Sequence, residues 1–343
     1  MLALITGGSG YFGSVLVKKL LERGYVCRIF DLNDADDRPK DAEFIKGDIR
    51  DYEAVLQACR GADVVHHNVA QVPLAKDHHL FQSVNIGGTE NLLRACGHNG
   101  VGKVVHTSSS AVFGVPSVLP VTENTFPAPA EAYGRAKFQA EEICGEYIKK
   151  GLDVSIVRPR TILGHGRLGI FQILFEWVSE GAKIPVLGKG DNIYQFVHSD
   201  DLAEVCIRAG ERAGASFYNS GAVEYGTMRE LLQGLCDYAA TGAKVRSVPM
   251  GLAVFAMKIT GKLRLSPLSD YHWLMYGRSM YFDNSKIKTE LDFTPRYSNN
   301  QMICESYDWY LKNKESLTYA GQGASAHRSA LKQGILKLIK LLP

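Results

Sequence analysis

Tyr133 and Lys137 stand four residues apart, a spacing that places both side chains on one face of a helix. A free phenol, with a pKa of about 10, is a poor base at neutral pH, and an ammonium group beside it favours the ionised form. The serine run 108–110 offers hydroxyl groups that can hold a substrate oxygen while a tyrosine moves its proton. A Tyr-x-x-x-Lys spacing alone is most often structural, so the prediction of acid–base chemistry depends on the elements that position these residues.

Short β-branched runs alternate with helical patterns along the first half of the chain, which is typical of βαβ units and a parallel sheet. The predicted strands cover residues 2–5, 25–30, 43–46, 64–67, 103–107 and 153–157. The predicted helices cover residues 12–22, 52–59, 80–96 and 133–149. The serine run follows the fifth strand, so it lies at the carboxyl edge of the sheet, where open α/β sheets bind ligands.

A glycine-rich loop, residues 6–13, follows the first strand and opens the first helix. Its glycines satisfy both Gly-x-Gly-x-x-Gly (8, 10, 13) and Gly-x-x-Gly-x-x-Gly (7, 10, 13). Glycine lets the backbone approach a pyrophosphate that sits on the free N–H groups of the helix N-terminus. The alternative is a glycine-rich turn beside surface acids, which the strand–loop–helix context disfavours.

Two acidic residues support a dinucleotide site. Asp31 ends the second strand, at the separation from the loop where a carboxylate accepts hydrogen bonds from the adenosine ribose. Such a carboxylate repels a 2′-phosphate and favours NAD over NADP, although Arg28 and Arg38 keep NADP open as an alternative. Asp48 follows the third strand, where the adenine amino group could donate to it.

Together these features resemble the extended short-chain dehydrogenase/reductase family, in the group of NAD-dependent epimerases and dehydratases. The resemblance extends from Met1 to about Leu311. It is carried by seven segments, namely residues 6–13, 47–51, 85–89, 108–114, 133–137, 158–159 and 197–203. It implies an α/β fold with a Rossmann-type doubly wound parallel sheet and a smaller, interleaved C-terminal substrate lobe.

The resemblance also implies roles for individual residues. Tyr133 becomes the general acid/base, Lys137 also holds the nicotinamide ribose, and Ser109 becomes the catalytic serine, with Ser108 and Ser110 as the alternatives. The residues implied in cofactor binding are Gly7, Gly10, Tyr11, Phe12, Gly13, Asp31, Asp48, Ile49, Ala70, Tyr133, Lys137 and Pro159. One departure is Val69, a bulkier residue than relatives usually have beside the nicotinamide ribose.

The substrate lobe separates two branches of the family. Sugar-nucleotide members resemble one another in an Asn soon after the Arg-Pro strand and an Arg just before the Val-His segment, and this chain has neither. Arg160, Arg167 and Arg278 could supply phosphate contacts by another route. The layout of residues 276–283 is closer to the 3β-hydroxysteroid dehydrogenase branch, as is the apolar segment 251–257, unless that segment is an ordinary core helix.

We therefore expect an NAD(P)-dependent oxidoreductase that moves a hydride between nicotinamide and a secondary alcohol or ketone of a hydrophobic, steroid- or isoprenoid-like substrate. A nucleotide-sugar epimerase or dehydratase with tightly bound NAD is the alternative enzyme. A third interpretation is a non-catalytic nucleotide sensor, which would not need Ser109, Tyr133 and Lys137.

Composition restricts the partners and the location. The 39 Lys and Arg residues exceed the 36 Asp and Glu residues by only three, too few for a nucleic-acid-binding surface. Seven scattered cysteines are typical of reduced thiols, no signal peptide precedes the first strand, and the longest uncharged apolar run is far below the ~20 residues of a membrane span. We expect a cytoplasmic protein, a homodimer, without a metal site because no ligand spacing appears among its ten histidines. His198 is expected to anchor the lobe junction.

The predicted domains interleave along the chain. The dinucleotide-binding domain covers residues 1–163 and returns over 195–221, where 195–198 is expected as a further strand of that domain. The substrate lobe covers 164–194 and 222–320, and residues 321–343 form a linker and tail. Residues 327–343 carry four basic residues and no acid, and on a helix they form a basic amphipathic face that can attach to a membrane surface. The alternative is a frayed or protein-docked tail.

Overall fold

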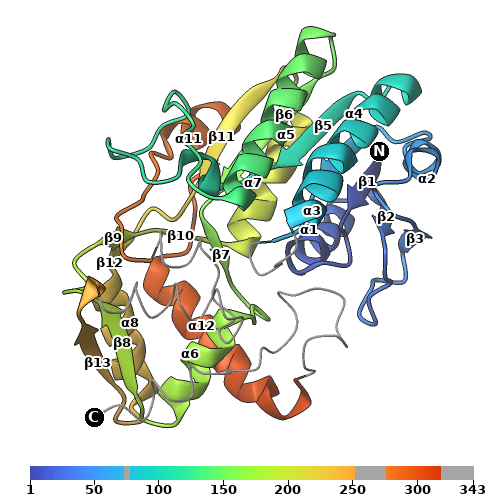
Figure 1. Ribbon diagram of the computed structural model, residues 1–343. Coiled ribbons are helices and arrows are strands. Elements are labelled where there is room, and N and C mark those ends of the chain that lie inside the picture. The colour runs from blue at the N-terminus through green and yellow to red at the C-terminus, as the bar shows by residue number, and fades with distance from the viewer. Residues whose placement is uncertain (73–77, 252–275, 318–343) are drawn as a thin grey trace.

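A seven-stranded parallel sheet forms the centre of the computed structural model, which describes residues 1–72, 78–251 and 276–317 (Figure 1). All neighbouring strands of this sheet run parallel. Their spatial order is β11 (Ser216–Ser220), β6 (Val154–Pro159), β5 (Lys103–Thr107), β4 (Val64–His67), β1 (Leu2–Thr6), β2 (Val26–Asp31) and β3 (Ala42–Lys46). The order reverses between β1 and β4, which opens a crevice at the carboxyl ends of these strands. The predicted fold class is confirmed.

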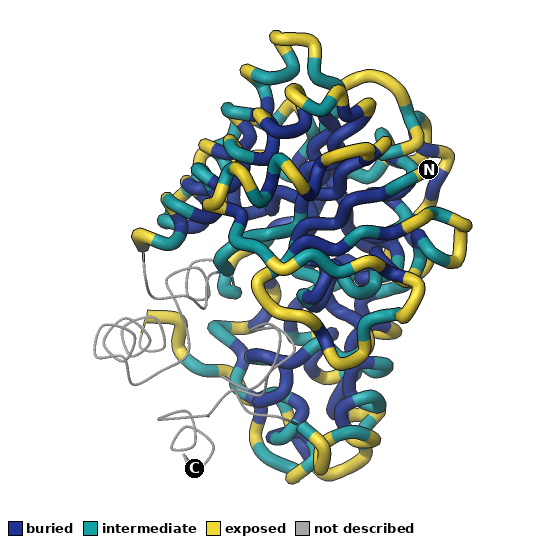
Figure 2. Tube along the Cα trace, turned by 90° about the vertical axis from the view of Figure 1, so that its right-hand side faces the viewer, coloured by how far each residue is buried: buried dark blue, intermediate teal, exposed yellow. Residues whose placement is uncertain are grey.

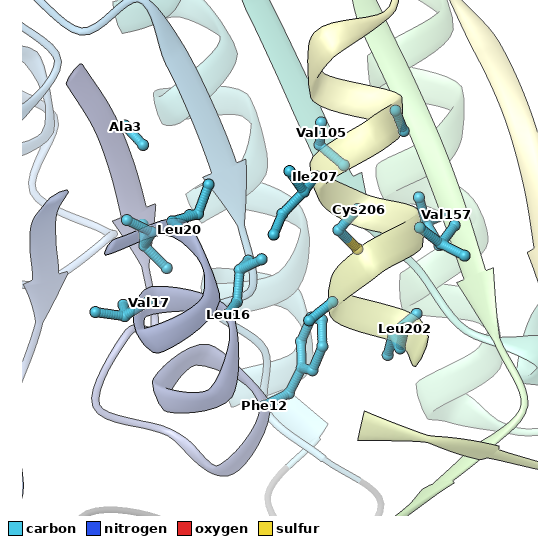
Figure 3. Close-up of a cluster of buried hydrophobic side chains, with 14 of the residues drawn as sticks. Ala3, Phe12, Leu16, Val17, Leu20, Val105, Val157, Leu202, Cys206 and Ile207 are labelled. Carbon is cyan, nitrogen blue, oxygen red and sulfur yellow. The ribbon is translucent and has the colours of Figure 1, made fainter. Parts of the chain in front are cut away.

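Helices cover both faces of the sheet because its strands are apolar on both sides. One face is covered by α1 (Tyr11–Glu22) and α7 (Ser199–Glu211), and the other by α2 (Tyr52–Ala58), α4 (Gly88–Asn99) and α5 (Ala132–Lys149). Leu16 and Leu20 of α1 lie in one buried cluster with Cys206 and Ile207 of α7 and with Val105 of the sheet (Figure 3). The four-residue spacing of the α1 leucines gives that helix its apolar stripe.

The helix predicted over residues 80–96 is present, but it is not one regular α-helix. The structure divides this segment into α3 (His78–Leu80), a π-helical stretch η1 (Phe81–Gly87) and α4. Asn85 explains the interruption, because its side chain accepts from the backbone N–H of Gln71 at 2.7 Å and donates to the Gln71 carbonyl at 3.1 Å. The wider turn therefore attaches the helix to the loop that follows β4, a common use of π-helical turns near functional sites.

A smaller lobe with its own apolar core lies beyond the carboxyl ends of the sheet, below it in Figure 1. Its helices are α6 (Ile170–Ser179), α8 (Met228–Ala239) and α12 (Asn299–Asn313), the last followed by a short 3-10 turn η3 (Lys314–Ser316). Its described residues also form two small sheets, β8 (Lys183–Leu187) with β13 (Lys244–Val248) and β9 (Ile193–Tyr194) with β12 (Gly226–Thr227). Helix α11 (Ser285–Leu291) instead packs beside β11 in the core of the main sheet.

The segment expected as a further strand of the dinucleotide-binding domain does not join the main sheet. It forms β10 (Phe196–His198), which pairs in parallel with β7 (Thr161–Leu163) as a separate two-stranded sheet. The edge beside β6 is taken by β11, paired from Ser155↔Ser216 to Pro159↔Ser220, so β10 follows the continuation of β6 into the smaller lobe. The helix after β10, α7, does return to the main sheet.

Buried residues concentrate in the strands and on the inner helix faces, whereas the connecting turns are exposed (Figure 2). Within the described residues, no helix combines the length and apolar character required to cross a bilayer. Most of the apolar segment 251–257, the linker 321–326 and the basic tail 327–343 lie outside the described residues.

A buried ion pair joins α5 to β6 close to the serine run. Arg158 donates to both carboxylate oxygens of Glu141, at 2.9 and 2.6 Å, and both side chains are almost fully buried. Ser108 donates to the same carboxylate at 2.5 Å. This bidentate pair fixes the helix that carries Tyr133 and Lys137 against the sheet edge.

Replacing Glu141 with Gln should destabilise the protein by about 3–5 kcal/mol, because it leaves the Arg158 guanidinium buried without a counter-charge. The free energy of unfolding in urea measures this effect. Glu142→Gln, on the exposed face of the same helix, is the matched control and should change it by less than about 0.5 kcal/mol. Equal effects of the two substitutions would contradict the role of this pair.

Candidate active site

A cavity of about 420 Å³ lies at the carboxyl edge of the sheet, between the crevice and the smaller lobe. It is lined by both acids that follow strands, by the glycine loop, by the serine run and by α5. Every residue to which the family resemblance gives a catalytic or cofactor-binding role lines it, namely Gly7, Gly10, Tyr11, Phe12, Gly13, Asp31, Asp48, Ile49, Ala70, Ser109, Tyr133, Lys137 and Pro159. The fold therefore brings residues more than 150 positions apart to one site.

The glycine loop has the shape of a phosphate cradle. Gly7 has a φ of +72°, and a Cβ there would lie 2.9 Å from the Val69 nitrogen. A Cβ on Gly13 would lie only 2.1 Å from the Gly7 carbonyl oxygen. Helix α1 begins after Gly10 with no side-chain cap and no acid in its first turn, so its first N–H groups remain available to an anion. These residues fit the pyrophosphate of a dinucleotide.

Asp31 is held at the end of β2 by the loop itself. Its carboxylate accepts from the backbone N–H of Ser9 at 3.1 Å and from that of Leu32 at 2.7 Å. Burial raises the pKa of Asp31, and these backbone hydrogen bonds oppose the rise. The carboxylate lines the cavity where a ribose hydroxyl would donate to it.

The two arginines that kept NADP as an alternative cofactor in the sequence analysis are bound to other groups in the structure. Arg28 binds Glu43 at 2.7 Å, and Arg38 binds Asp34 at 2.8 Å. Neither arginine lines the cavity. At the same end, Arg50 does line the cavity, but it is bound to Asp48, and this contact lowers the pKa of the Asp48 carboxyl. The acidic character of the Asp31 position therefore favours NAD.

The acid–base group is assembled from α5 and the end of β5. Glu131 caps α5 and accepts from the backbone N–H groups of Tyr133 and Gly134, which fixes the first turn. The Tyr133 side chain faces Ser109, whose hydroxyl acts to lower the pKa of the phenol. One helical turn later, the Lys137 ammonium donates to the Thr107 carbonyl at 2.8 Å.

The three adjacent serines have three different partners. Ser108 donates to Glu141, and Ser110 accepts from Arg160 at 2.9 Å. Ser109 precedes a short 3-10 turn η2 (Ser110–Phe113), accepts from the N–H of Ala111 and faces Tyr133. Of the three, Ser109 alone pairs with Tyr133, which favours it over its two neighbours as the serine that holds a substrate oxygen.

Burial dominates the electrostatics of this group. It raises the pKa of Tyr133 to about 12, while the Ser109 hydroxyl and the charge of Arg167 oppose the rise. It also lowers the pKa of Lys137 to about 8. Burial therefore outweighs the influence expected of Lys137, an ammonium that favours the ionised form of Tyr133. Tyr133 is a neutral phenol at pH 7, able to donate a proton to a substrate oxygen.

Sequence reasoning missed the polar residues beneath Lys137. The Thr107 hydroxyl donates to the Asn68 side chain at 2.7 Å, which links the ends of β5 and β4. His67 is buried between Thr6 at 2.7 Å and Thr89 at 3.0 Å, and burial lowers its pKa to about 3, so it is neutral. The position of Asn68 and Thr107 at strand ends is the signal that could have identified them.

One group of three among the described residues could hold a metal ion by its composition, namely His165, His198 and Glu305. Nδ1 of His198 accepts from the backbone N–H of Asp200 at 3.1 Å, so the proton of the neutral ring is on Nε2. That Nε2 faces Glu305 at 3.6 Å and has no lone pair to offer a metal. The group does not fit a metal site and acts as a polar anchor at the start of α7.

Replacing Lys137 with Met should change how stability depends on pH. The pKa of Lys137 falls from 10.5 in a free lysine to about 8 in the folded protein, so the unfolded chain binds this proton more tightly. The wild type therefore gains stability as pH rises from 8 to 10.5, and the variant lacks this gain. In urea unfolding between pH 7 and 10, the free energy of Lys137→Met minus that of wild type should fall with pH. The exposed Lys40→Met control should show a constant difference, and a constant difference for Lys137→Met would contradict the shift.

Comparisons with known proteins agree with this geometry. Residues 3–221 match the family model of the NAD dependent epimerase/dehydratase family. The chain is 55% identical to the Sinorhizobium fredii protein y4nG over 338 residues, 98% of this chain and 85% of that protein. It is 30% identical over 212 residues to the mouse sterol-4-alpha-carboxylate 3-dehydrogenase, decarboxylating, covering 60% of this chain and 58% of that enzyme.

Among solved structures, the UDP-glucose 4-epimerase of Thermus thermophilus in complex with NAD superimposes with a TM-score of 0.75. The two proteins are 26% identical, and the match covers 91% of this chain and 99% of the epimerase. The family model, the relatives and the dinucleotide cavity agree. The chain therefore belongs to the NAD-dependent epimerase/dehydratase family of extended short-chain dehydrogenases/reductases.

Proposed function

We propose that this protein is an NAD-dependent oxidoreductase that acts on a secondary alcohol or the corresponding ketone. The observation that carries the proposal is the position of Ser109, Tyr133 and Lys137 together beside the dinucleotide groove, with Lys137 fixed by the Thr107 carbonyl. NAD, when bound, supplies the hydride acceptor or donor at C4 of its nicotinamide. In alcohol oxidation the C–H hydride leaves with the cofactor and the O–H proton leaves through Tyr133, so that ketone, NADH and one proton result.

Ser109, Tyr133 and Lys137 have different roles in the proposed reaction. Ser109 and Tyr133 hold the substrate oxygen, and Tyr133 transfers the proton. Lys137, fixed by the Thr107 carbonyl, holds a positive charge beneath the tyrosine and reaches the ribose side of the groove. A nucleotide sensor would use the groove but not the proton-transfer group, so the complete assembly favours an enzyme.

We propose a hydrophobic, steroid- or isoprenoid-like substrate. The two segments in which sugar-nucleotide enzymes resemble one another, the one after the Arg-Pro strand and the one before the Val-His segment, make structural contacts here, since Thr161 bonds the Tyr194 hydroxyl at 2.8 Å. Gln195 likewise donates to the Ala222 carbonyl at 2.6 Å and accepts from the Phe282 N–H at 2.8 Å. The cavity is also lined by apolar side chains outside the glycine loop, those of Val72, Leu80, Ile162, Ile170 and Phe171. The sterol-carboxylate relative supports the same class of substrate.

A nucleotide-sugar epimerase or dehydratase is the second candidate. It is favoured by the near-complete overlap with the Thermus thermophilus epimerase structure. In that reaction the hydride returns to the product, and no net NADH accumulates. The same Tyr133 and Ser109 would serve, so the two candidates differ in substrate rather than in acid–base group.

Two further proposals rest on the sequence pattern. The basic residues of 327–343 would attach the protein to an anionic membrane surface, which gives access to a membrane-dissolved substrate. A homodimer in the cytoplasm is the proposed assembly.

The function is tested by supplying NAD with a panel of 3β-hydroxysteroids and, separately, with UDP- and dTDP-sugars. We expect absorbance at 340 nm to rise with a steroid, and Tyr133→Phe to reduce the rate by about 10²- to 10⁴-fold with little change in NAD affinity. Tyr147→Phe, later on the same helix, should leave the rate unchanged. Interconversion of sugars without NADH would select the second candidate, and full activity of Tyr133→Phe would contradict both.

The cofactor assignment is tested at Asp31. Asp31→Asn removes a charged acceptor for the ribose hydroxyl, so NAD should bind about 10- to 100-fold more weakly while NADP binding weakens less. Asp36→Asn, exposed in the following loop, is the control and should alter neither affinity. Titration of NADH and NADPH fluorescence measures both. A wild type that prefers NADPH would refute the assignment.

A further inference from the structure

Arg160 is the largest fully buried side chain of the described protein and is only 1% exposed. Its Nη1 donates to Ser110 at 2.9 Å, and its guanidinium lies over the rings of Tyr194 at 4.7 Å and Phe282 at 5.8 Å. Its Nε and Nη2 make no hydrogen bond, and no acid in the described part of the chain pairs with it. Burying a guanidinium without a counter-ion is costly, so this open edge requires an explanation.

A comparison within the same segment shows how unusual this is. Arg158, two residues earlier, is buried to a similar extent but has the bidentate Glu141 carboxylate. The fold thus supplies an acid for one arginine and leaves the Nε–Nη2 edge of the other unpaired. That edge is the part of a guanidinium that binds two oxygens of a carboxylate or phosphate side by side.

The position of Arg160 indicates where such an anion would come from. Arg160 lines the active-site cavity, and its hydrogen-bond partner Ser110 is the neighbour of Ser109. A second cation, Arg167, lines the same end of the cavity, lies 5.3 Å from the Tyr11 ring and acts electrostatically on Tyr133.

The acids that line the described cavity lie at one end of it. Asp31 and Asp48 are at the adenosine end, together with Arg50, which is bound to Asp48. The end that receives the substrate has Lys137, Arg160 and Arg167, with no acid among the described lining residues. A neutral ligand would leave the Nε–Nη2 edge of Arg160 without a counter-charge among the described residues.

We propose that the substrate carries an anionic oxygen group, a carboxylate or a phosphate, that Arg160 and Arg167 bind beside the reacting carbon. The group would neutralise the open guanidinium edge and orient the substrate oxygen toward Ser109 and Tyr133. This proposal rests on the proposed function for the placement of the reacting carbon. For the first candidate function, it restricts the hydrophobic substrate to one with an acidic substituent. For the second candidate, the diphosphate of a nucleotide sugar would present the same anionic oxygens.

The test measures binding to the NAD-saturated protein by titration calorimetry, so that it does not depend on turnover. The probes are 3-hydroxydodecanoate, its neutral counterpart 2-undecanol, and UDP. We expect one of the two anionic probes to bind at least 10-fold more tightly than 2-undecanol. Arg160→Met should weaken the binding of that anionic probe by about 10- to 100-fold and leave the affinity for 2-undecanol unchanged. Preference for the hydroxy acid identifies a carboxylate and preference for UDP a diphosphate.

Stability separates this role from a structural one. If Arg160 is kept for a ligand, Arg160→Met should unfold at an equal or higher urea concentration than wild type when no ligand is present, because an unpaired buried charge has been removed. Arg167→Met gives a second measurement of the anion preference if Arg160→Met does not fold. Arg135→Met, exposed on α5, is the control and should change nothing.

Three results would overturn the proposal: equal binding of charged and neutral probes, unchanged binding of the anionic probe to both variants, or destabilisation of Arg160→Met without a change in binding. Tyr133→Phe keeps both arginines and should keep the anion preference. If the protein prefers the anionic probe but oxidises no alcohol, the proposed reaction is refuted and the anion site is not. If it oxidises an alcohol but binds charged and neutral probes equally, only the anion site is refuted.

Discussion

The burial of one polar face of α5 is the constraint on which the site depends. Tyr133, Lys137 and Glu141 follow one another at four-residue intervals and all face the end of the sheet, where water cannot satisfy them. Each side chain therefore has a protein partner, which is Ser109, the Thr107 carbonyl or Arg158 respectively. Because three contacts at successive turns fix the helix, the phenol of Tyr133 is positioned without depending on a mobile loop.

The same burial determines the protonation of the site. Removal from water disfavours both a phenolate and an ammonium, so the pKa of Tyr133 rises while that of Lys137 falls. The site without ligand is therefore poised to donate a proton rather than to remove one. Positive charge that enters with a ligand would shift this balance toward phenolate, which couples the acid–base state of Tyr133 to occupancy of the groove.

The charged side chains at the cavity differ in whether the protein itself neutralises or stabilises them. Asp31 is stabilised by backbone N–H groups of the glycine loop and presents a carboxylate to the adenosine end. Arg158 and Arg160 belong to one segment but differ in role, because Glu141 neutralises the first and nothing described neutralises the second. A structural ion pair thus lies two residues from an open cation that lines the cavity, a stability cost typical of binding sites.

The sequence by itself determined the features that depend on neighbouring residues. These are the alternation of strands and helices, the glycine spacing of the phosphate loop, the acid after β2 and the Tyr133–Lys137 pair, all of which follow from local backbone geometry. Only the tertiary structure decided which serine faces Tyr133, that β10 leaves the main sheet, that Asn85 interrupts a helix, and that burial outweighs Lys137 in the ionisation of Tyr133. It also decided that Arg160, 50 positions from its partner Ser110, has no acid beside it among the described residues. These outcomes depend on which distant segments pack together and exclude water, and no local pattern records that.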